Sequence, residues 1–300
     1  MSNSSNYLTK ILDSQKLDDG SDALKSLRKH RKDVEEILRA TYGNRPTIRY
    51  GGSYAKGTMI KEAYDLDIIC YFPRDETLAG TTLKGIYENV EAALTDNYYV
   101  LRRTSVLRLK DNSPKHYMED FHIDVAPGRY IDGDDGDVFL FQTSGDKDCL
   151  KTNLQTHIDH VKDSGVIDAL CLIKLWRVRN NIQIKQFALD MLVIKLLGAH
   201  KKDDLATQLL HVWTEFRDNS KQLAVVDPAN PNGNDLKPVL DAHRATLSQV
   251  AHTTIDTIEN NGWEAVFGEI DDNNPKNKQA TLRRMAASVT LPTKPWFSER

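Results

Sequence analysis

The feature that most constrains this chain is a pair of aspartates at the head of an apolar run, Asp65-Leu66-Asp67 followed by IICYF. Along a strand, residues i and i+2 point to the same face, so Asp65 and Asp67 are expected to project together. Two carboxylates held that close raise each other's pKa and need a compensating cation. Mg²⁺ suits them because it prefers hard oxygen ligands. Alternatively, Asp65 only caps the end of a strand and Asp67 forms an ion pair on the surface, since two aspartates separated by one residue are common by chance.

A glycine-rich turn lies shortly before the two acids. Gly51-Gly52-Ser53 follows the strand candidate at 48–50 and precedes a short helix expected at 54–61. Backbone N–H groups exposed in such a turn can hold an anion. A third acid is then expected on an adjacent strand, and Asp124 fits because apolar residues flank it in FHIDVAP. A phosphate-binding turn and metal-ligating acids on neighbouring strands are the two halves of a nucleoside triphosphate site.

Periodicity divides the chain into a mixed first half and a helical second half, which predicts an α+β fold with two lobes. We expect residues 1–150 to form the catalytic core and residues 151–300 to form a helical lobe. The elements expected in the first half are helices at 21–41, 54–61 and 81–95, and strands at 48–50, 66–72, 99–110 and 121–126. Those expected in the second half are helices at 152–163, 166–180, 186–198, 203–218, 236–260 and 277–288, with a loop of turn formers at 227–235.

Composition narrows the classes of function. The net charge of -3 gives no overall attraction to nucleic acid, so a polymeric nucleic acid is not the expected substrate. The chain has three cysteines without metal-binding or paired spacing, which argues against a zinc site or a disulfide frame. No apolar run approaches the roughly 20 residues of a membrane span, and the first residues lack an apolar signal core. A cytoplasmic protein without a membrane partner is expected.

The combined motifs resemble a known family. The strings GSYAKGT at 52–58, Asp65-Leu66-Asp67 and HIDVAP at 122–127 are similar to the signature of the polymerase-β-like nucleotidyltransferases. Within that superfamily, segments of the second half resemble the bacterial cGAS/DncV-like nucleotidyltransferases (CD-NTases), which are related to the oligoadenylate synthetases. Those segments are Lys174-Leu175-Trp176, the run QFALD at 186–190, DPANPN at 227–232 and GWEAVFG at 262–268.

The resemblance implies roles for individual residues. Asp65, Asp67 and Asp124 would be catalytic and would ligate two Mg²⁺, with Mn²⁺ as a substitute, and Asp124 would lie nearest the attacking ribose hydroxyl. The nucleotide-binding residues would be Gly52 and Ser53 at the donor triphosphate, Lys174 and Gln186 near the phosphates, and Phe187 as a stacking face for a base. The implied architecture is a mixed sheet with a long N-terminal spine helix and a helical lobe that closes the nucleotide cleft.

The resemblance also implies a reaction. A ribose hydroxyl of one NTP attacks the α-phosphate of another and releases pyrophosphate, giving a cyclic dinucleotide or trinucleotide second messenger in antiphage signalling. ATP is an expected substrate, and a regulatory protein is a candidate partner because some relatives require one.

Ordinary structural roles are the alternatives to some of these assignments. Lys174 lies in an apolar helix and could reach a surface, and Phe187 could be an ordinary core residue. Two other functions also fit the motifs. One is a nucleotidyltransferase acting on an RNA end or a small-molecule acceptor, although the former should carry a basic surface. The other is a non-catalytic nucleotide-binding partner protein, against which the three intact acids argue.

Overall fold

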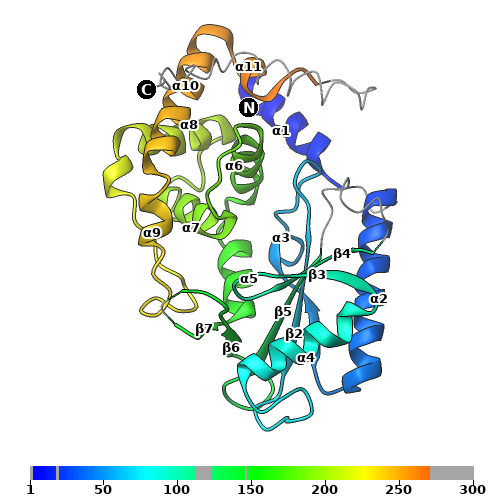
Figure 1. Ribbon diagram of the computed structural model, residues 1–300. Helices are drawn as coiled ribbons and strands as arrows, with labels where there is room; N and C mark the ends of the chain where they lie inside the picture. Colours follow the sequence, from blue (N-terminus) through cyan, green and yellow to red (C-terminus); the bar gives the residue numbers. More distant parts are fainter. Residues whose placement is uncertain (1–2, 18–19, 113–122, 146, 271–300) are drawn as a thin grey trace, which may run out of the picture.

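The computed structural model describes residues 3–17, 20–112, 123–145 and 147–270. Figure 1 shows a sheet with helices on one side and a separate group of helices on the other. The helices are α1 (Asn3–Gln15), α2 (Asp22–Tyr42), α3 (Gly52–Lys56), α4 (Leu83–Thr95), α5 (Leu154–Lys162), α6 (Ile167–Arg179), α7 (Gln186–Leu196), α8 (Leu205–Asp218), α9 (Lys237–Asp241), α10 (Arg244–Asn261) and α11 (Glu264–Phe267), with a 3-10 turn at Ser220–Gln222. The strands are β1 (Thr47–Tyr50), β2 (Leu66–Phe72), β3 (Tyr98–Arg102), β4 (Leu107–Asp111), β5 (Ile123–Tyr130), β6 (Val138–Phe141) and β7 (Cys149–Thr152).

The strands of the described residues form one mixed sheet. Its main order is β1-β2-β5-β4-β3, and β6 and β7 extend it from β5. The central strands β2 and β5 run parallel, whereas the other neighbours are antiparallel. The expected α+β fold with a mixed sheet is therefore confirmed.

The two faces of the sheet have different partners. Alternate residues of β2, from Leu66 to Phe72, enter a buried cluster with apolar residues of α2 and α4. The intervening positions, which include Asp67, point to the opposite face because side chains alternate along a strand. Ile123 and Val125 of β5 join the same cluster, so Asp124 also points to the opposite face. In Figure 1 that face lies toward the second group of helices.

The long N-terminal helix α2 is delimited by the residues that predicted it. The Ser21 side chain accepts a hydrogen bond from the backbone N–H of Leu24, which caps the first turn. Gly43 follows the last turn with φ at +64°, a conformation that favours glycine. Leu27, Val34 and Leu38 line its buried side, as the apolar spacing predicted.

Some expected elements differ from the structure. The strand expected at 99–110 is a hairpin of β3 and β4, because the polar residues between them turn the chain back. The helix expected at 236–260 is divided into α9 and α10 near His243. The helix expected at 54–61 is the shorter α3, which is terminated by Gly57, a residue in the left-handed backbone conformation. The elements α1, β6 and β7 were not expected. The helix expected at 277–288 and residues 121–122 lie outside the described residues.

The second group of helices has its own core. Buried apolar residues of α6, α7, α8 and α10 form one cluster, in which the indole N–H of Trp176 donates to the hydroxyl of Thr254 at 2.8 Å. The N-terminal helix α1 packs on this cluster through Leu8 and Ile11, although α2 packs on the sheet. Across the described ranges, no helix combines the length and apolarity needed to cross a membrane. The division at residue 150 stays a prediction.

Candidate nucleotide and metal site

Two of the predicted acids lie side by side on the central strands. In the parallel pair of β2 and β5, Asp67 is in register with Asp124. Asp65 immediately precedes β2, so it lies at the same end of the strand. The three acids share this region because the alternation of β2 and β5 sends their neighbours into the core on the other face. The sequence predicted that the third acid would lie on a strand adjacent to the first two, but it did not predict the register of Asp67 with Asp124, and the ligand roles of the acids stay predictions.

The electrostatics of Asp67 indicate an excess of negative charge. Burial, which has the largest effect, and the neighbouring charges of Asp65 and Asp124 together raise the pKa of Asp67 to about 7. The positive charges of Lys56 and Lys174 lower the pKa of Asp67, but by less than burial and the two acids raise it. A cation between these carboxylates would favour their ionised forms. The acids therefore fit a divalent cation, whose preferred ligands are such oxygens.

The glycine-rich turn lies against Asp67. The backbone N–H of Gly51 donates to the backbone oxygen of Asp67 at 2.8 Å, which joins the turn to β2. Gly52 has φ at +51°, and a Cβ atom there would lie 1.6 Å from Oδ2 of Asp67. Within the described residues, the Ser53 hydroxyl is buried and has no hydrogen-bond partner. The turn thus offers a buried hydroxyl beside the acids, as expected for a phosphate-binding loop.

A guanidinium engages the third acid. Arg108 on β4 faces Asp124, and its Nε and Nη2 atoms donate to the two carboxylate oxygens at 2.8 and 2.7 Å. Asp124 is 8% exposed, so this pairing occurs in a largely desolvated place. Among residues that the structure describes, no group of three or more His, Cys, Asp and Glu side chains is already arranged to hold a metal ion. Arg108 thus fixes the orientation of the Asp124 carboxylate in this structure.

Lys174 is buried, not exposed on a surface. It is 5% exposed on α6, and burial lowers its pKa while Asp65 and Asp190 oppose that shift. Asp190 on α7 is also buried and accepts a hydrogen bond from Nε2 of Gln186 at 2.6 Å. The amide oxygen of Gln186 is buried without a partner in the described structure. Lys174 and Gln186 thus belong to one buried polar cluster that reaches toward Asp65.

Phe187 lies between two basic side chains at the start of α7. Its ring centre is 4.8 Å from that of His157 and 5.4 Å from Nζ of Lys56. His157 is held by Asp227, with 2.7 Å between Nε2 and Oδ1. Phe187 is half-buried and packs against the core of the second helical group, so it has a structural role whether or not a base also contacts it.

Three neighbours of the site were not predicted as site residues. Lys56, Arg108 and Asp190 all lie close enough to the acids or to Lys174 for their charges to interact. Lys56 and Asp190 occur inside the quoted motifs GSYAKGT and QFALD. Their position within those motifs could have identified Lys56 and Asp190 as site residues. Arg108 could not be distinguished from a surface charge until the pairing of β4 with β5 was known.

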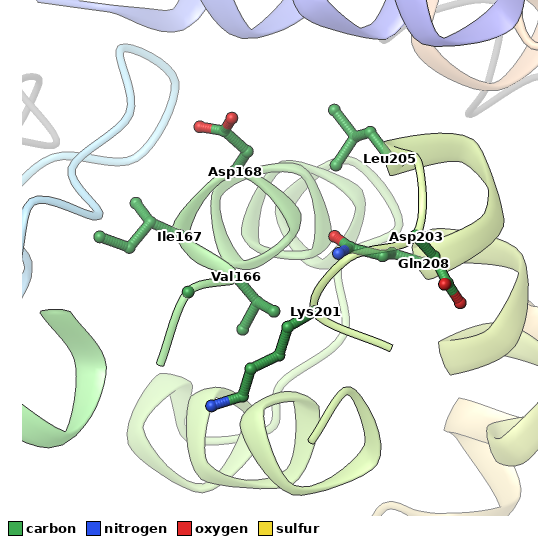
Figure 2. Close-up of a pocket in the computed structure, with 8 residues that line it drawn as sticks. Val166, Ile167, Asp168, Lys201, Asp203, Leu205 and Gln208 are labelled. Carbon is green, nitrogen blue, oxygen red and sulfur yellow. The ribbon is translucent and has the colours of Figure 1, made fainter. Parts of the chain in front are cut away.

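A hollow in the helical half does not coincide with this site. Its volume is about 360 Å³, and residues of the α5–α6 connection and of the start of α8 line it. In Figure 2 the charged ends of Asp168, Lys201 and Asp203 point in different directions and do not converge. None of the predicted site residues lines this hollow.

Comparison with known proteins supports the interpretation of the acids. The pattern that defines the nucleotidyltransferase domain family matches residues 27–121. This stretch of the sequence is therefore similar to a nucleotidyltransferase domain. The match includes the glycine-rich turn, Asp65, Asp67 and Arg108 and ends before Asp124. Comparison of the sequence with curated proteins gave no match.

Solved structures extend the likeness beyond the nucleotidyltransferase domain. The CD-NTase CdnG of Bradyrhizobium diazoefficiens, in complex with GTP, has a TM-score of 0.68 and 14% identity over 93% of this chain and 97% of its own. CdnC of E. coli MS115-1, in complex with HORMA-deltaN, has a TM-score of 0.64 and 18% identity, and the match covers 89% of this chain and 97% of CdnC. DncV of Vibrio cholerae, a cyclic AMP-GMP synthase in complex with nonhydrolyzable GTP, has a TM-score of 0.59 and 15% identity, and the match covers 90% of this chain and 85% of DncV. The chain has the polymerase-β-like fold of these CD-NTases.

Proposed function

We propose that this protein is a nucleotidyltransferase that joins NTPs into a cyclic dinucleotide or trinucleotide with release of pyrophosphate. The observation that carries the proposal is the register of Asp67 with Asp124, with Gly52 directly against the Asp67 carboxylate. This arrangement places a phosphate-binding turn beside paired acids. The fold and the nucleotidyltransferase domain support the same class of reaction.

The donor nucleotide binds at the glycine-rich turn. The Ser53 hydroxyl and the backbone N–H groups at the start of α3 hold its triphosphate, which explains a buried hydroxyl without a protein partner. Lys174 on α6, whose charge interacts with that of Asp65, adds a positive charge. Phe187 packs against the donor base, since an aromatic ring tolerates any base on its face.

Asp65, Asp67 and Asp124 would hold divalent cations, which we take to be Mg²⁺. When bound, such a pair stabilises the charges that develop on the attacking and leaving oxygens. Asp124 orients the acceptor ribose hydroxyl and accepts its proton. Burial of Asp124 limits the access of competing water to this carboxylate.

Cyclisation, antiphage signalling and a cytoplasmic location are parts of this proposal that follow from the likeness of the motifs to those of CD-NTases. A regulatory protein partner is proposed on the same ground, since CdnC is known in complex with HORMA-deltaN.

The test is incubation of the purified protein with each labelled NTP, singly and together, with Mg²⁺ and then with Mn²⁺. Products are treated with phosphatase and separated, and Asp65→Asn/Asp67→Asn serves as the matched inactive variant. A phosphatase-resistant product that the variant does not make supports the proposal. Products that remain linear point to another acceptor, and absence of NTP binding would refute the nucleotidyltransferase itself.

A further inference from the structure

The loop between α3 and β2 carries Asp65, but it is anchored away from the sheet. Ile60 is 1% exposed and belongs to the core of the second group of helices, and Ala63 packs against the same core. The backbone N–H of Ala63 donates to the backbone oxygen of Ile60 at 3.1 Å, which closes a tight turn over residues 60–63. Leu66, three residues later, lies in the core that β2 shares with α2 and α4. The loop therefore passes from one core to the other immediately before β2.

Gln15, the last residue of α1, binds the tip of this turn. Its backbone oxygen accepts a hydrogen bond from the N–H of Lys61 at 2.8 Å, and its side-chain oxygen accepts one from the N–H of Glu62 at 3.2 Å. Its Nε2 atom donates to Oε1 of Glu62 at 3.0 Å. In Figure 1 the loop reaches from the sheet to this end of α1. Gln15 is 6% exposed, so its side chain holds the turn in a place largely shielded from water.

Arg179, the last residue of α6, holds Glu62 from a second helix. Its Nε and Nη2 atoms donate to the two carboxylate oxygens of Glu62 at 3.1 and 2.6 Å. The Glu62 and Arg179 side chains are 9% and 13% exposed. Because the donors of a guanidinium lie in a planar fork, a pairing with both oxygens fixes the orientation of the carboxylate. Two helices that pack in the second group thus fix the turn through one side chain.

The three acids of the candidate site are therefore positioned by different parts of the fold. The paired register of β2 with β5 begins at Leu66, and it includes Asp67 and Asp124 but not Asp65. Asp65 lies one residue before that register and three residues after Glu62. A displacement of the turn would consequently move Asp65 more than it moves the two acids that the sheet holds.

We propose that Gln15 and Glu62 are positioning residues for Asp65, and that through it they set the affinity of the site for divalent cations. This inference rests on the proposed function, in which Asp65 is a metal ligand. Residues that support a metal ligand hold it in the orientation that the ion requires, so their loss weakens metal binding although every ligand is still present. The competing interpretation is that these contacts only join α1 and α6 to the loop and stabilise the fold.

The experiment measures Mn²⁺ binding by electron paramagnetic resonance. The protein is saturated with the α,β-methylene analogue of ATP, which cannot react, and the analogue without protein gives the background. We expect Gln15→Met, which keeps the size of the side chain but removes its hydrogen bonds, to weaken Mn²⁺ binding by about tenfold, the lower end of what supporting residues of metal sites contribute. Glu62→Gln should weaken it at least as much, because it also removes the carboxylate that Arg179 holds.

The same substitutions in the Asp65→Asn protein show whether they act through Asp65. Asp65→Asn alone should weaken Mn²⁺ binding, since it removes a charged ligand. Gln15→Met or Glu62→Gln should then have little further effect, because the ligand that they position is gone; effects that act through one group are not additive.

Gln208→Met is the matched control. Gln208 on α8 is 5% exposed, and its Nε2 atom donates to the backbone oxygen of His200 at 2.9 Å, within the second group of helices. Its replacement removes a hydrogen bond of a buried glutamine, as Gln15→Met does, but away from the turn. Urea unfolding should show a loss of stability in both variants, whereas Mn²⁺ binding should be unchanged in Gln208→Met.

Unchanged Mn²⁺ binding in both Gln15→Met and Glu62→Gln would overturn the inference and leave the proposed function intact. Equal weakening in Gln208→Met, or a further loss in the Asp65→Asn protein as large as in the wild-type protein, would also overturn it. Undiminished Mn²⁺ binding in Asp65→Asn itself would instead refute the role of Asp65 as a ligand, and with it both the inference and the metal site of the proposed function.

Discussion

Gly52 and Asp67 are in such close contact that a Cβ atom at position 52 would lie 1.6 Å from the Oδ2 atom of Asp67. The missing side chain at position 52 is therefore a condition for the position of this carboxylate. The positive φ of Gly52 adds a second reason for glycine, since other residues adopt that conformation at a cost. The turn and the acid form one structural unit, although 15 positions separate them in the sequence.

Replacement of Gly52 by alanine should displace the Asp67 carboxylate and lower nucleotidyl transfer by at least about tenfold, since even supporting residues of metal sites contribute about 10- to 100-fold. Gly57→Ala is the matched control. Gly57 also has positive φ, but a Cβ atom there meets nothing within 4 Å. Pyrophosphate release measures the activity of both variants. Equal losses in the two would attribute the effect to backbone strain alone.

Neutralising Asp67 should have opposite effects on activity and on stability. The buried carboxylate is repelled by Asp65 and Asp124, and at pH 8 it is ionised despite its raised pKa of about 7. In the presence of a chelator, Asp67→Asn should therefore raise the free energy of unfolding, by about 1–3 kcal/mol. Urea unfolding at pH 8 measures this, and addition of Mg²⁺ should stabilise only the wild-type protein. A variant less stable than wild type in chelator would contradict the repulsion.

The ion pair of Glu62 with Arg179 should contribute strongly to the stability of the fold. Their closest atoms are 2.6 Å apart and both side chains are largely buried, which joins the segment before Asp65 to α6. Arg179→Met leaves a buried carboxylate unpaired and should cost about 3–5 kcal/mol. Arg102→Met, which removes a more exposed pair, should cost no more than about 1 kcal/mol. Similar losses in chemical unfolding would show that burial of the first pair is unimportant.

Asp227, at the start of the loop 227–235, should make the stability of the folded protein depend on pH in the acid range. Burial favours the neutral carboxyl, but hydrogen bonds from His157 and Asn234 together outweigh it and lower the pKa of Asp227 below its ordinary 3.8. A carboxylate with a lowered folded-state pKa stabilises the protein above its unfolded-state pKa, and this contribution is lost as the pH falls through the folded-state pKa. Asp227→Asn should thus be less stable than wild type at pH 7, and the difference should shrink below about pH 4. A difference that is independent of pH would contradict this assignment.

Phe187 should affect affinity for nucleotides but not for inorganic triphosphate. A base that stacks on its ring gains about 1–3 kcal/mol, so Phe187→Leu should weaken ATP binding by roughly tenfold to a hundredfold. Phe187→Tyr retains the ring and should bind ATP like wild type. Calorimetric titration with ATP and with triphosphate separates these cases. Parallel weakening of both ligands in Phe187→Leu would make Phe187 a core residue only.

Local patterns predicted much of the catalytic half. The strand at 66–72 was predicted to the residue, because the apolar run IICYF directly follows Leu66-Asp67 and ends at Pro73. The helix α2 was predicted within one residue at each end by Ser21 and Gly43. The hairpin of β3 and β4 was taken as one strand, since its turn lacks the usual glycine or proline. The short strands β6 and β7 were missed because four residues carry too little periodicity.

The sequence by itself determined the identity of the acids, the glycine-rich turn and the alternation that turns Asp67 away from the core. These depend on chemistry and spacing within a few residues. Only the tertiary structure decided that Asp67 is in register with Asp124, that Arg108 pairs with Asp124, and that α1 packs on the helices of the second half. Such contacts join distant segments, and a pairing between strands follows from the free energy of the whole core and not from any local pattern.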